Sequence, residues 1–484
     1  MIRTEWRDRT SVPIRRINDG GDALMQYDDR PHDSSDLISD ELGCCDWYLR
    51  STARPLPSFP LLPESTSTPV SAPSCGVPPL LTTREHLHEA ASVLKKGQGP
   101  VAIDTERASA YRYDDRAFLL QVKRAGSGLF LIDAEACRPH MKLLAPVLNP
   151  LTWIIHSART DLPALFDIGL IPRCLFDTEM GGRIAGLERV NLADMVNGFV
   201  GYRLAKGYGK EDWSRRPLPP DWLNYAALDV EYLLDLFTAL SGLLAELERF
   251  SWWKEECAFI RSSTLAGSPS ISPSSRIKGL HLLSTAAQRT LAAALWNERD
   301  RRARSTDRSP HRILSNTTLI AIARKDPATI QELTQTAHFQ SLRQARPWWE
   351  TIHRARQSTT PPSIQLTELP QHLGQNKSRA SGAHRTIATY DGGRRFPQTS
   401  RGDYAQRLYS LCSQAIKTTT KHTGITHDVV ISPHVVRLMA WHFSCASRCD
   451  AADIDEFFAQ SGVRRWQRRI ATPVCADALS TWGL

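Results

Sequence analysis

A short apolar run ends in two carboxylates at Val101-Ala102-Ile103-Asp104-Thr105-Glu106. Side chains alternate between the two faces of a strand, so a spacing of two places both acidic side chains on the same face. Two neighbouring carboxylates repel each other, and a divalent cation is the commonest reason for such a pair. Taken alone, the run is explained more simply by a strand that runs out into solvent.

Further apolar runs follow at residues 118–122, 129–132 and 153–155, and helical patterns occupy residues 86–94 and 141–148. Three of the runs lie close together before strands begin to alternate with helices. This order predicts a mixed sheet with helices packed against it. The sequence therefore predicts an α/β domain that ends near residue 250.

Two later segments add further acidic residues. Asp161 follows the apolar run 153–155, and Tyr225 and Asp229 lie in residues 224–234, which have a helical pattern. A spacing of four makes Tyr225 and Asp229 neighbours on one face of that helix. Tyr225 by itself would most simply be a core or edge aromatic residue.

The combination of these motifs is more specific than its parts. Asp-x-Glu on a first strand, an Asp after a later strand and Tyr-x-x-x-Asp on a following helix resemble the DEDD exonuclease superfamily in its tyrosine-bearing branch, and within it the ribonuclease D family. The resemblance covers residues 80–245, and residues 104–113 look like the actinobacterial form. Further matching words are Leu119-Leu120-Gln121-Val122, Phe176-Asp177-Thr178, Leu204-Ala205-Lys206, Asp212-Trp213 and Arg216-Pro217-Leu218.

The resemblance implies a fold and an activity. The implied fold is α/β, a ribonuclease H-like mixed sheet of the DnaQ-like 3′–5′ exonuclease type, followed by two small all-α bundles that resemble the HRDC module. The implied activity is hydrolysis of RNA from the 3′ end to nucleoside 5′-monophosphates, with two divalent ions, Mg²⁺ or Mn²⁺, as cofactors. The substrates would be tRNA precursors and other structured RNAs.

The resemblance also assigns roles to five residues. Asp104 would bridge both ions, Glu106 and Asp229 would complete the shell of one, and Asp161 would act largely through water on the other. Carboxylates are the hard oxygen ligands that such ions prefer. Tyr225 would orient the attacking water, because a phenol with a pKa of about 10 is a poor base at neutral pH.

Four other residues near these motifs remain open to two interpretations. His156 stands before Asp161 at a strand end, and we expect a structural role rather than that of a base. Lys206 contacts substrate phosphate or is an ordinary solvated lysine, and Asp177 caps the following helix or takes part in catalysis. Gln121 is expected beside the site, without a role that the sequence assigns.

Composition changes divide the chain further. Eight prolines among residues 55–79 and a serine-rich run at 262–275 indicate breaks in regular structure. The predicted divisions are a disordered leader at 1–78, the exonuclease domain at 79–250, a linker at 251–279, an HRDC domain at 280–356, a flexible linker at 357–402 and a second HRDC-like helical domain at 403–484.

Arginine clusters in the two helical blocks are candidates for RNA binding. One cluster between residues 299 and 312 contains six arginines and two aspartates, which is typical of a phosphate-binding surface or of a solvated helix face. In the second block Arg465 precedes Trp466, whose indole either stacks on RNA or lies in the core. The candidate RNA-binding residues are Lys206, Arg299, Arg301, Arg302, Arg304 and Arg465.

The overall composition limits the class of protein. The 484 residues carry a formal net charge of +9, which is a weak bias toward an anionic partner. The ten cysteines form no Cys-x-x-Cys pair, and no apolar stretch is long enough to cross a membrane. No signal peptide is recognisable at the N-terminus. We therefore expect a cytoplasmic protein without membrane contact, and from the family resemblance a monomer.

Two other functions remain compatible with the sequence. The same four carboxylates serve 3′–5′ DNA exonucleases, and no residue identifies a contact to a 2′-hydroxyl group. A catalytically silent nucleic-acid-binding scaffold is the other alternative. The presence of all four carboxylates and of Tyr225 argues against the silent scaffold.

Overall fold

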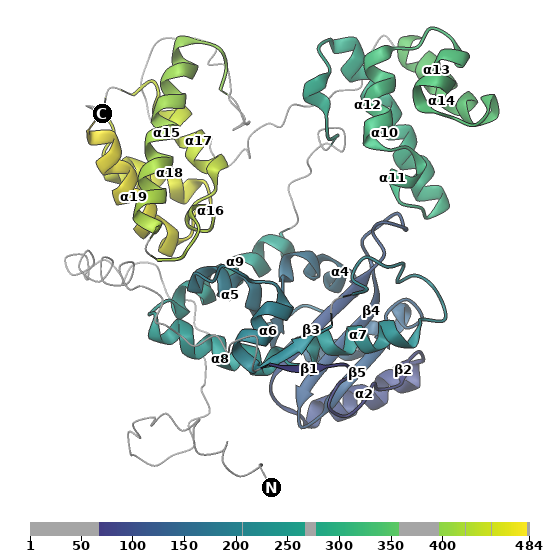
Figure 1. The fold of residues 1–484 in the computed structure, drawn as a ribbon, viewed down its shortest axis with the longest axis vertical. Coiled ribbons are helices and arrows are strands. Elements are labelled where there is room, and N and C mark those ends of the chain that lie inside the picture. The colour runs from purple at the N-terminus through teal and green to yellow at the C-terminus, as the bar shows by residue number, and fades with distance from the viewer. Residues whose placement is uncertain are drawn as a thin grey trace. The chain divides into compact units, whose positions relative to one another are not determined.

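The structure is a computed structural model that describes residues 67–205, 207–266, 277–357, 396–421, 423–446 and 448–481. These residues form an α/β domain and two helical blocks, drawn along the chain in Figure 1. Residues 1–66 of the predicted leader and residues 358–395 of the predicted second linker lie outside the described residues. Within the described ranges, no helix has both the length and the apolar character that a membrane crossing requires.

The α/β domain is built on a six-stranded mixed sheet with the strand order β2-β5-β4-β3-β6-β7. Strand β4 is antiparallel to both β3 and β5, whereas β3, β6 and β7 run parallel to one another. The predicted mixed sheet is therefore confirmed. The strands are β2 (Leu80–Leu81), β3 (Gln98–Arg107), β4 (Ala117–Ala125), β5 (Gly128–Asp133), β6 (Thr152–Ile155) and β7 (Cys174–Asp177).

Helices cover both faces of this sheet. On one face α7 packs against β3, β4 and β5, and Leu119 and Leu131 contact Ala226 and Ala227 of that helix. The other face joins a larger core with α2. The helical elements of the domain are α2 (Arg84–Lys96), η2 (Arg138–Leu144), α3 (Ala145–Leu148), η3 (Ala158–Thr160), α4 (Leu162–Asp167), α5 (Thr178–Ala185), α6 (Leu192–Val200), α7 (Pro220–Glu231), α8 (Leu233–Glu246) and α9 (Phe250–Leu265).

The domain begins earlier than the sequence predicted. Strand β1 (Thr68–Val70) pairs in parallel with β8 (Tyr202–Leu204), and the Ser74 hydroxyl donates a 2.7 Å hydrogen bond to Glu231 at the end of α7. The prediction that the leader extends to residue 78 is therefore wrong. A three-residue strand with a proline at its centre has no periodicity that a sequence pattern can detect.

The domain also ends later than predicted. Residues 251–265, assigned to a linker, belong to α9, which packs against β7 and α5. Trp253, Cys257 and Ile260 are fully buried at helical spacing. The polar residues between them and the serines that follow obscured this apolar face in the sequence. Residues 267–276 of the predicted linker lie outside the described residues.

Two helical blocks follow. The first has its own apolar core, and Ser315 caps α12, its hydroxyl accepting a 3.0 Å hydrogen bond from the Thr318 backbone. Its elements are η5 (Leu280–Leu282), α10 (Ala286–Thr306), α11 (Pro310–Ile313), α12 (Asn316–Lys325), α13 (Ile330–Ala337) and α14 (Leu342–Gln357). The second block contains α15 (Ser400–Thr420), α16 (His427–Val430), α17 (Pro433–Phe443), α18 (Ala451–Gln460) and α19 (Arg465–Ser480).

Candidate active site

Strand β3 and helix α7 bring three carboxylates together. Asp104 and Glu106 leave β3 on the face that α7 covers, and Asp229 lies in the last turns of α7. One carboxylate oxygen from each residue lies within 4.8 Å of the other two. The sequence predicted the pair on β3 from its spacing, and the packing of α7 across the sheet adds the third group.

The three carboxylates lie in an environment that disfavours negative charge. Burial, followed by repulsion from Asp229, raises the pKa of Asp104 to about 8. Burial also raises the pKa of Asp229 to about 7 and, together with the charge of Asp104, raises the pKa of Glu106 well above its usual value. A divalent cation removes both penalties, because it supplies positive charge and takes oxygen ligands. This set of oxygen donors therefore fits a divalent metal ion.

Asp161 lies beside these three carboxylates, and residues of β3 hold it in position. It follows η3 and is buried, and the Thr105 hydroxyl donates a 3.0 Å hydrogen bond to its Oδ1 atom. The Nε atom of Arg107 lies 3.5 Å from the same oxygen. The Asp161 charge contributes to the raised pKa of Glu106, so the two carboxylates interact. All four predicted carboxylates are thus brought to one site.

Tyr225 lies one helical turn before Asp229 on α7, and its hydroxyl is hydrogen-bonded to the Asp229 carboxylate. Burial and the charge of Asp229 raise the pKa of this phenol far above its usual value. The phenol is therefore neutral at physiological pH. A neutral phenol can position a water molecule by hydrogen bonding.

The structure assigns structural contacts to two residues whose roles were open. The His156 ring lies 2.9 Å from the Thr178 hydroxyl, and burial lowers its pKa to about 4. The Asp177 carboxylate accepts hydrogen bonds from four backbone N–H groups, two at the start of α5 and two at Ser157 and Ala158. Asp177 therefore caps α5 and fixes the turn that leads to Asp161.

Gln121 lies on β4 directly opposite Asp104, on the same face of the sheet. Its side chain is fully buried, and neither polar atom has a hydrogen-bond partner among the described residues. Its predicted position beside the site is therefore correct. The structure adds Thr105 and Arg107, which the sequence did not single out although Thr105 lies between the two acidic residues of β3 and Arg107 directly follows them.

Comparison with known proteins identifies the family. Three family models match the chain, a 3′–5′ exonuclease over residues 79–245, an HRDC domain over 288–346 and a 3′ to 5′ exonuclease C-terminal domain over 400–479. Ribonuclease D of Xanthomonas oryzae is 35% identical over 241 residues, which are 49% of this chain and 65% of the relative. Ribonuclease D of Jannaschia sp. is 30% identical over 279 residues, which are 56% of this chain and 70% of the relative. The chain belongs to the ribonuclease D family.

Solved structures share the fold of this chain. A protein from Bifidobacterium adolescentis matches with a TM-score of 0.68 and 26% identity, over 86% of this chain and all of that chain. RNase D of Escherichia coli shares the fold, with a TM-score of 0.56 at 20% identity over 84% of this chain and 99% of that chain. Membership of the ribonuclease D family makes the chain a hydrolase of the 3′–5′ exoribonuclease class, with an exonuclease domain that depends on divalent metal.

The structure places the predicted RNA-binding residues of this ribonuclease D family member in different surroundings. Arg299 is buried and donates hydrogen bonds to Leu314 and Asn316, so its prediction as a phosphate contact is wrong. Its position in a run of arginines gave no sign that it faces the bundle core. Lys206 lies outside the described residues.

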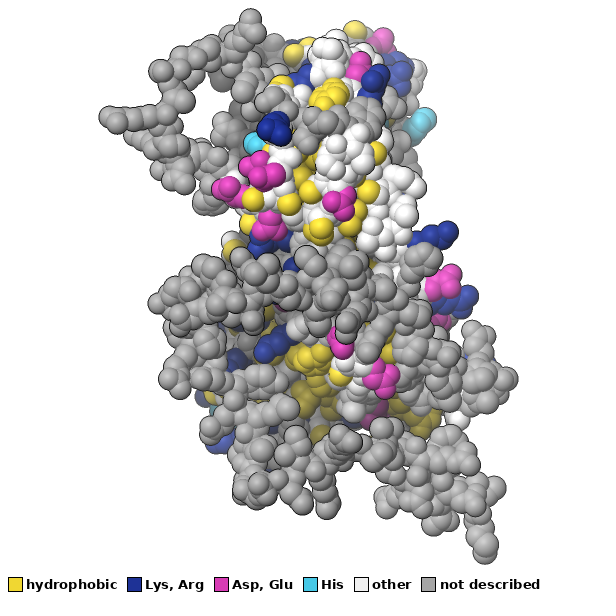
Figure 2. Space-filling model, turned by 90° about the vertical axis from the view of Figure 1, so that its left-hand side faces the viewer, with side chains coloured by type: hydrophobic (Ala, Val, Ile, Leu, Met, Phe, Trp, Pro, Cys, Tyr) yellow, Lys and Arg dark blue, Asp and Glu magenta, His cyan; other side chains and the backbone are white. Residues whose placement is uncertain are grey.

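The other arginines of α10 have acidic or aromatic neighbours. Arg301 and Arg302 both pair with Glu298, and Arg304 lies 3.3 Å from Asp300 and 2.9 Å from the Tyr113 hydroxyl. On the face of the described residues drawn in Figure 2, acidic side chains likewise stand among basic ones. RNA binding by these three arginines stays a prediction.

In the C-terminal block, Arg465 is exposed and its role in RNA binding also stays a prediction. Trp466 is buried, and its ring stacks on Trp252 of α9 with ring centroids 5.2 Å apart. The structure therefore supports the interpretation of Trp466 as a core residue rather than as a surface for RNA bases.

Proposed function

We propose that the chain hydrolyses RNA from its 3′ end, one nucleotide at a time, and releases nucleoside 5′-monophosphates with the help of two Mg²⁺ or Mn²⁺ ions. The observation that carries this proposal is the convergence of Asp104, Glu106 and Asp229, with Tyr225 one turn away on the same helix. Two divalent ions supply an activated water, charge stabilisation at the phosphoryl group and help for the leaving oxygen.

The side chains of the site have separate roles in metal binding and in positioning the attacking water. Asp104, Glu106 and Asp229 would hold one ion through oxygen ligands, and Asp161 together with Asp104 would hold the other. Buried carboxylates that repel one another in the metal-free chain bind cations strongly, because the cation relieves that repulsion. Tyr225, as a neutral phenol fixed against Asp229, orients the attacking water.

We further propose that the RNA substrates are tRNA precursors and other structured RNAs, met in the cytoplasm by a monomeric enzyme. Three features support an RNA substrate. The relatives are ribonucleases D, the net charge of +9 favours a polyanion, and an HRDC domain follows the exonuclease domain.

The test is a 3′-trimming assay with a 5′-labelled single-stranded RNA and a DNA of the same sequence, each with Mg²⁺, Mn²⁺ or EDTA. The wild type should give a metal-dependent ladder that shortens from the 3′ end of the RNA. Asp104→Asn should lower the rate by about 10³-fold or more. Asp235→Asn, which removes an exposed carboxylate from α8, is the matched control and should cleave at the wild-type rate.

The outcomes separate the alternatives. Equal trimming of DNA would replace the exoribonuclease with a nuclease that does not discriminate the sugar. Intact RNA in the presence of either metal, together with tight RNA binding, would replace the enzyme with a binding scaffold. A ladder that survives in Asp104→Asn would show that the carboxylate group on β3 and α7 is not the catalytic centre.

A further inference from the structure

Arg107 ends strand β3 directly after the two predicted metal ligands of that strand. The Arg107 guanidinium extends from the surface toward the cluster of four carboxylates. The Arg107 side chain is 23% exposed, whereas the side chain of Asp161, which it contacts, is 6% exposed. Arg107 is not among the predicted site residues and has no part in the proposed metal chemistry. A cation beside four carboxylates therefore needs an explanation.

The contacts of Arg107 come from two directions. Its Nε atom lies 3.5 Å from Asp161 Oδ1, and its Nη1 atom donates a 3.2 Å hydrogen bond to Asp115. Asp115 lies in the loop between β3 and β4, and its side chain is 61% exposed. The guanidinium thus bridges the buried site and a loop that solvent reaches.

The contact with Asp161 is incomplete as a hydrogen bond. The Nε atom is buried, yet it has no hydrogen-bond partner among the described residues, and Asp161 Oδ1 already accepts the Thr105 hydroxyl. A buried N–H group without an acceptor carries a free-energy cost that a new acceptor removes. The Nε donor of Arg107 therefore lies beside Asp161 without a hydrogen-bond acceptor among the described residues.

The positive charge of Arg107 acts on several of the clustered carboxylates at once. It opposes the effect of burial on the pKa of Asp104, Glu106 and Asp161. Once divalent ions neutralise these carboxylates, the attraction that holds Arg107 on Asp161 is largely cancelled. The anionic acceptors that RNA brings to such a site are phosphate oxygens, which match the planar guanidinium in geometry and charge.

We propose that Arg107 is a phosphate-binding residue of the active site, which pairs with Asp161 in the RNA-free chain and binds a phosphodiester oxygen at the RNA 3′ end in the complex. This inference rests on the proposed function, because it takes the carboxylate group as the place where RNA is cleaved. The competing role is that of a structural residue that only holds Asp161 in position.

Arg107→Gln and Arg107→Lys in the full chain distinguish these roles. Three quantities are measured: Mn²⁺ affinity by calorimetry without RNA, affinity in Mn²⁺ for a fluorescent single-stranded RNA with a cleavage-resistant 3′ end over a range of salt concentrations, and kcat/KM with Mn²⁺. Arg84→Gln is the matched control, because it removes the same charge from the exposed start of α2.

For a phosphate-binding residue, Arg107→Gln keeps Mn²⁺ affinity within about twofold and lowers kcat/KM by about 10- to 100-fold. The slope of log affinity against log salt falls by about 0.7, the value for one lost phosphate contact on a single strand. Arg107→Lys recovers part of the loss, and Arg84→Gln leaves kcat/KM and the salt slope unchanged.

Two results would overturn the inference. One is a loss of Mn²⁺ affinity in Arg107→Gln that matches its loss of activity, with an unchanged salt slope, which is the pattern of a structural residue. The other is unchanged kcat/KM and RNA affinity in both variants. If the wild type itself cleaves no RNA, the proposed function fails, and the metal and RNA affinities still decide whether Arg107 contacts phosphate.

Discussion

The buried carboxylates of the active site lower the stability of the metal-free fold when they are ionised. The pKa of Asp104 is raised from 3.8 to about 8 and that of Asp229 from 3.8 to about 7. A carboxyl group whose pKa is higher in the folded chain binds more protons folded than unfolded. The contribution of these two carboxyl groups to the free energy of unfolding of the metal-free protein therefore falls as pH rises between about 4 and 8.

This linkage gives a prediction about stability. In EDTA, Asp104→Asn should be more stable than the wild type at pH 8, because it removes one repelling charge, and the difference should close toward pH 5. The expected gain in Tm is about 2 to 4 °C for each kcal/mol of repulsion that is removed. Thermal unfolding across this pH range measures it, and Mn²⁺ should raise the Tm of the wild type only.

Asp235→Asn, on the exposed surface of α8, is the control for the loss of a charge as such, and it should show no such pH dependence. If Asp104→Asn is instead less stable than the wild type at pH 8 without metal, the carboxylate stabilises the fold, and the idea of a strained metal site is wrong.

At the scale of elements, the position of Asp161 depends on how closely α5 packs. Asp177 caps α5 and holds the turn before Asp161, and its backbone carbonyl accepts a 2.7 Å hydrogen bond from Trp253 of α9. Gly181 of α5 allows this packing. A Cβ atom there would lie 2.6 Å from Leu240 of α8 and 2.8 Å from the Trp253 ring.

Replacing Gly181 with Ala should therefore destabilise the protein by about 1–3 kcal/mol, because the neighbouring side chains must move. Gly242→Ala is the matched control, since Gly242 lies inside α8 with nothing within 4 Å of its position for a Cβ atom. That change should stabilise the protein by up to about 1 kcal/mol. Denaturant unfolding measures both variants, and equal effects at the two sites would contradict the packing argument.

Some elements of the fold could be predicted from the sequence and others could not. Strand β3 and helix α7 were predictable because spacings of two and four are local patterns that place side chains on one face. Strand β1 was missed because its three residues have no period and are held only by pairing with distant β8. Helix α9 was missed because its buried tryptophans precede a serine-rich run.

The same distinction applies to the site. The acids were recognised by their type and spacing, whereas the pairing of Arg107 with Asp161 joins two elements that no local pattern connects. Arg299 failed as an RNA-binding prediction for a related reason. Its charge suggested the surface, but its hydrogen bonds to Leu314 and Asn316 are visible only in the folded bundle.

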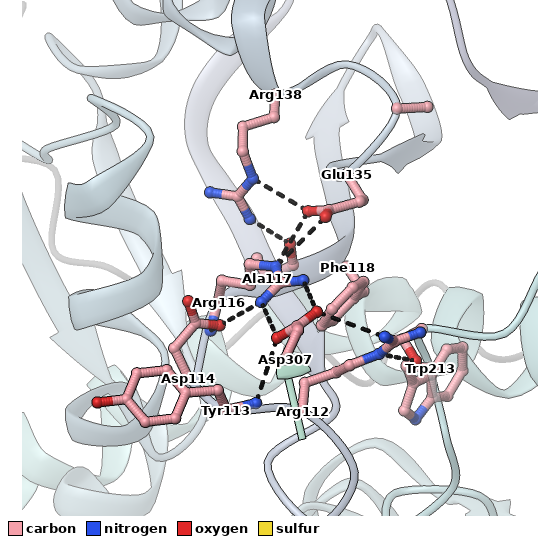
Figure 3. Close-up of polar contacts among 12 residues, drawn as sticks. Arg112, Tyr113, Asp114, Arg116, Ala117, Phe118, Glu135, Arg138, Trp213 and Asp307 are labelled. Carbon is pink, nitrogen blue, oxygen red and sulfur yellow. Dashed lines mark hydrogen bonds and ion pairs between the residues drawn. The ribbon is translucent and has the colours of Figure 1, made fainter. Parts of the chain in front are cut away.

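At the scale of the whole molecule, charged side chains connect the exonuclease domain with the HRDC domain. Figure 3 shows Asp307, the residue that ends α10, among side chains of the loop between β3 and β4. Its carboxylate lies 2.8 Å from Arg116 and 3.4 Å from Arg112. The loop that carries these arginines also carries Asp115, the partner of Arg107. The contact is therefore placed to couple the HRDC domain to the active site.

Asp307→Asn tests this coupling, because asparagine keeps the shape and tolerates the left-handed backbone of this position, where φ is 47°. Hydrogen exchange followed by mass spectrometry should show faster exchange over residues 111–116 in the variant, and high salt should bring the wild type toward the same rate. Asp326→Asn is the matched control, since Asp326 ends α12 with φ at 48° and pairs with Arg356 inside the HRDC domain. Unchanged exchange in Asp307→Asn, or an equal change in Asp326→Asn, would show that this ion pair does not hold the loop in solution.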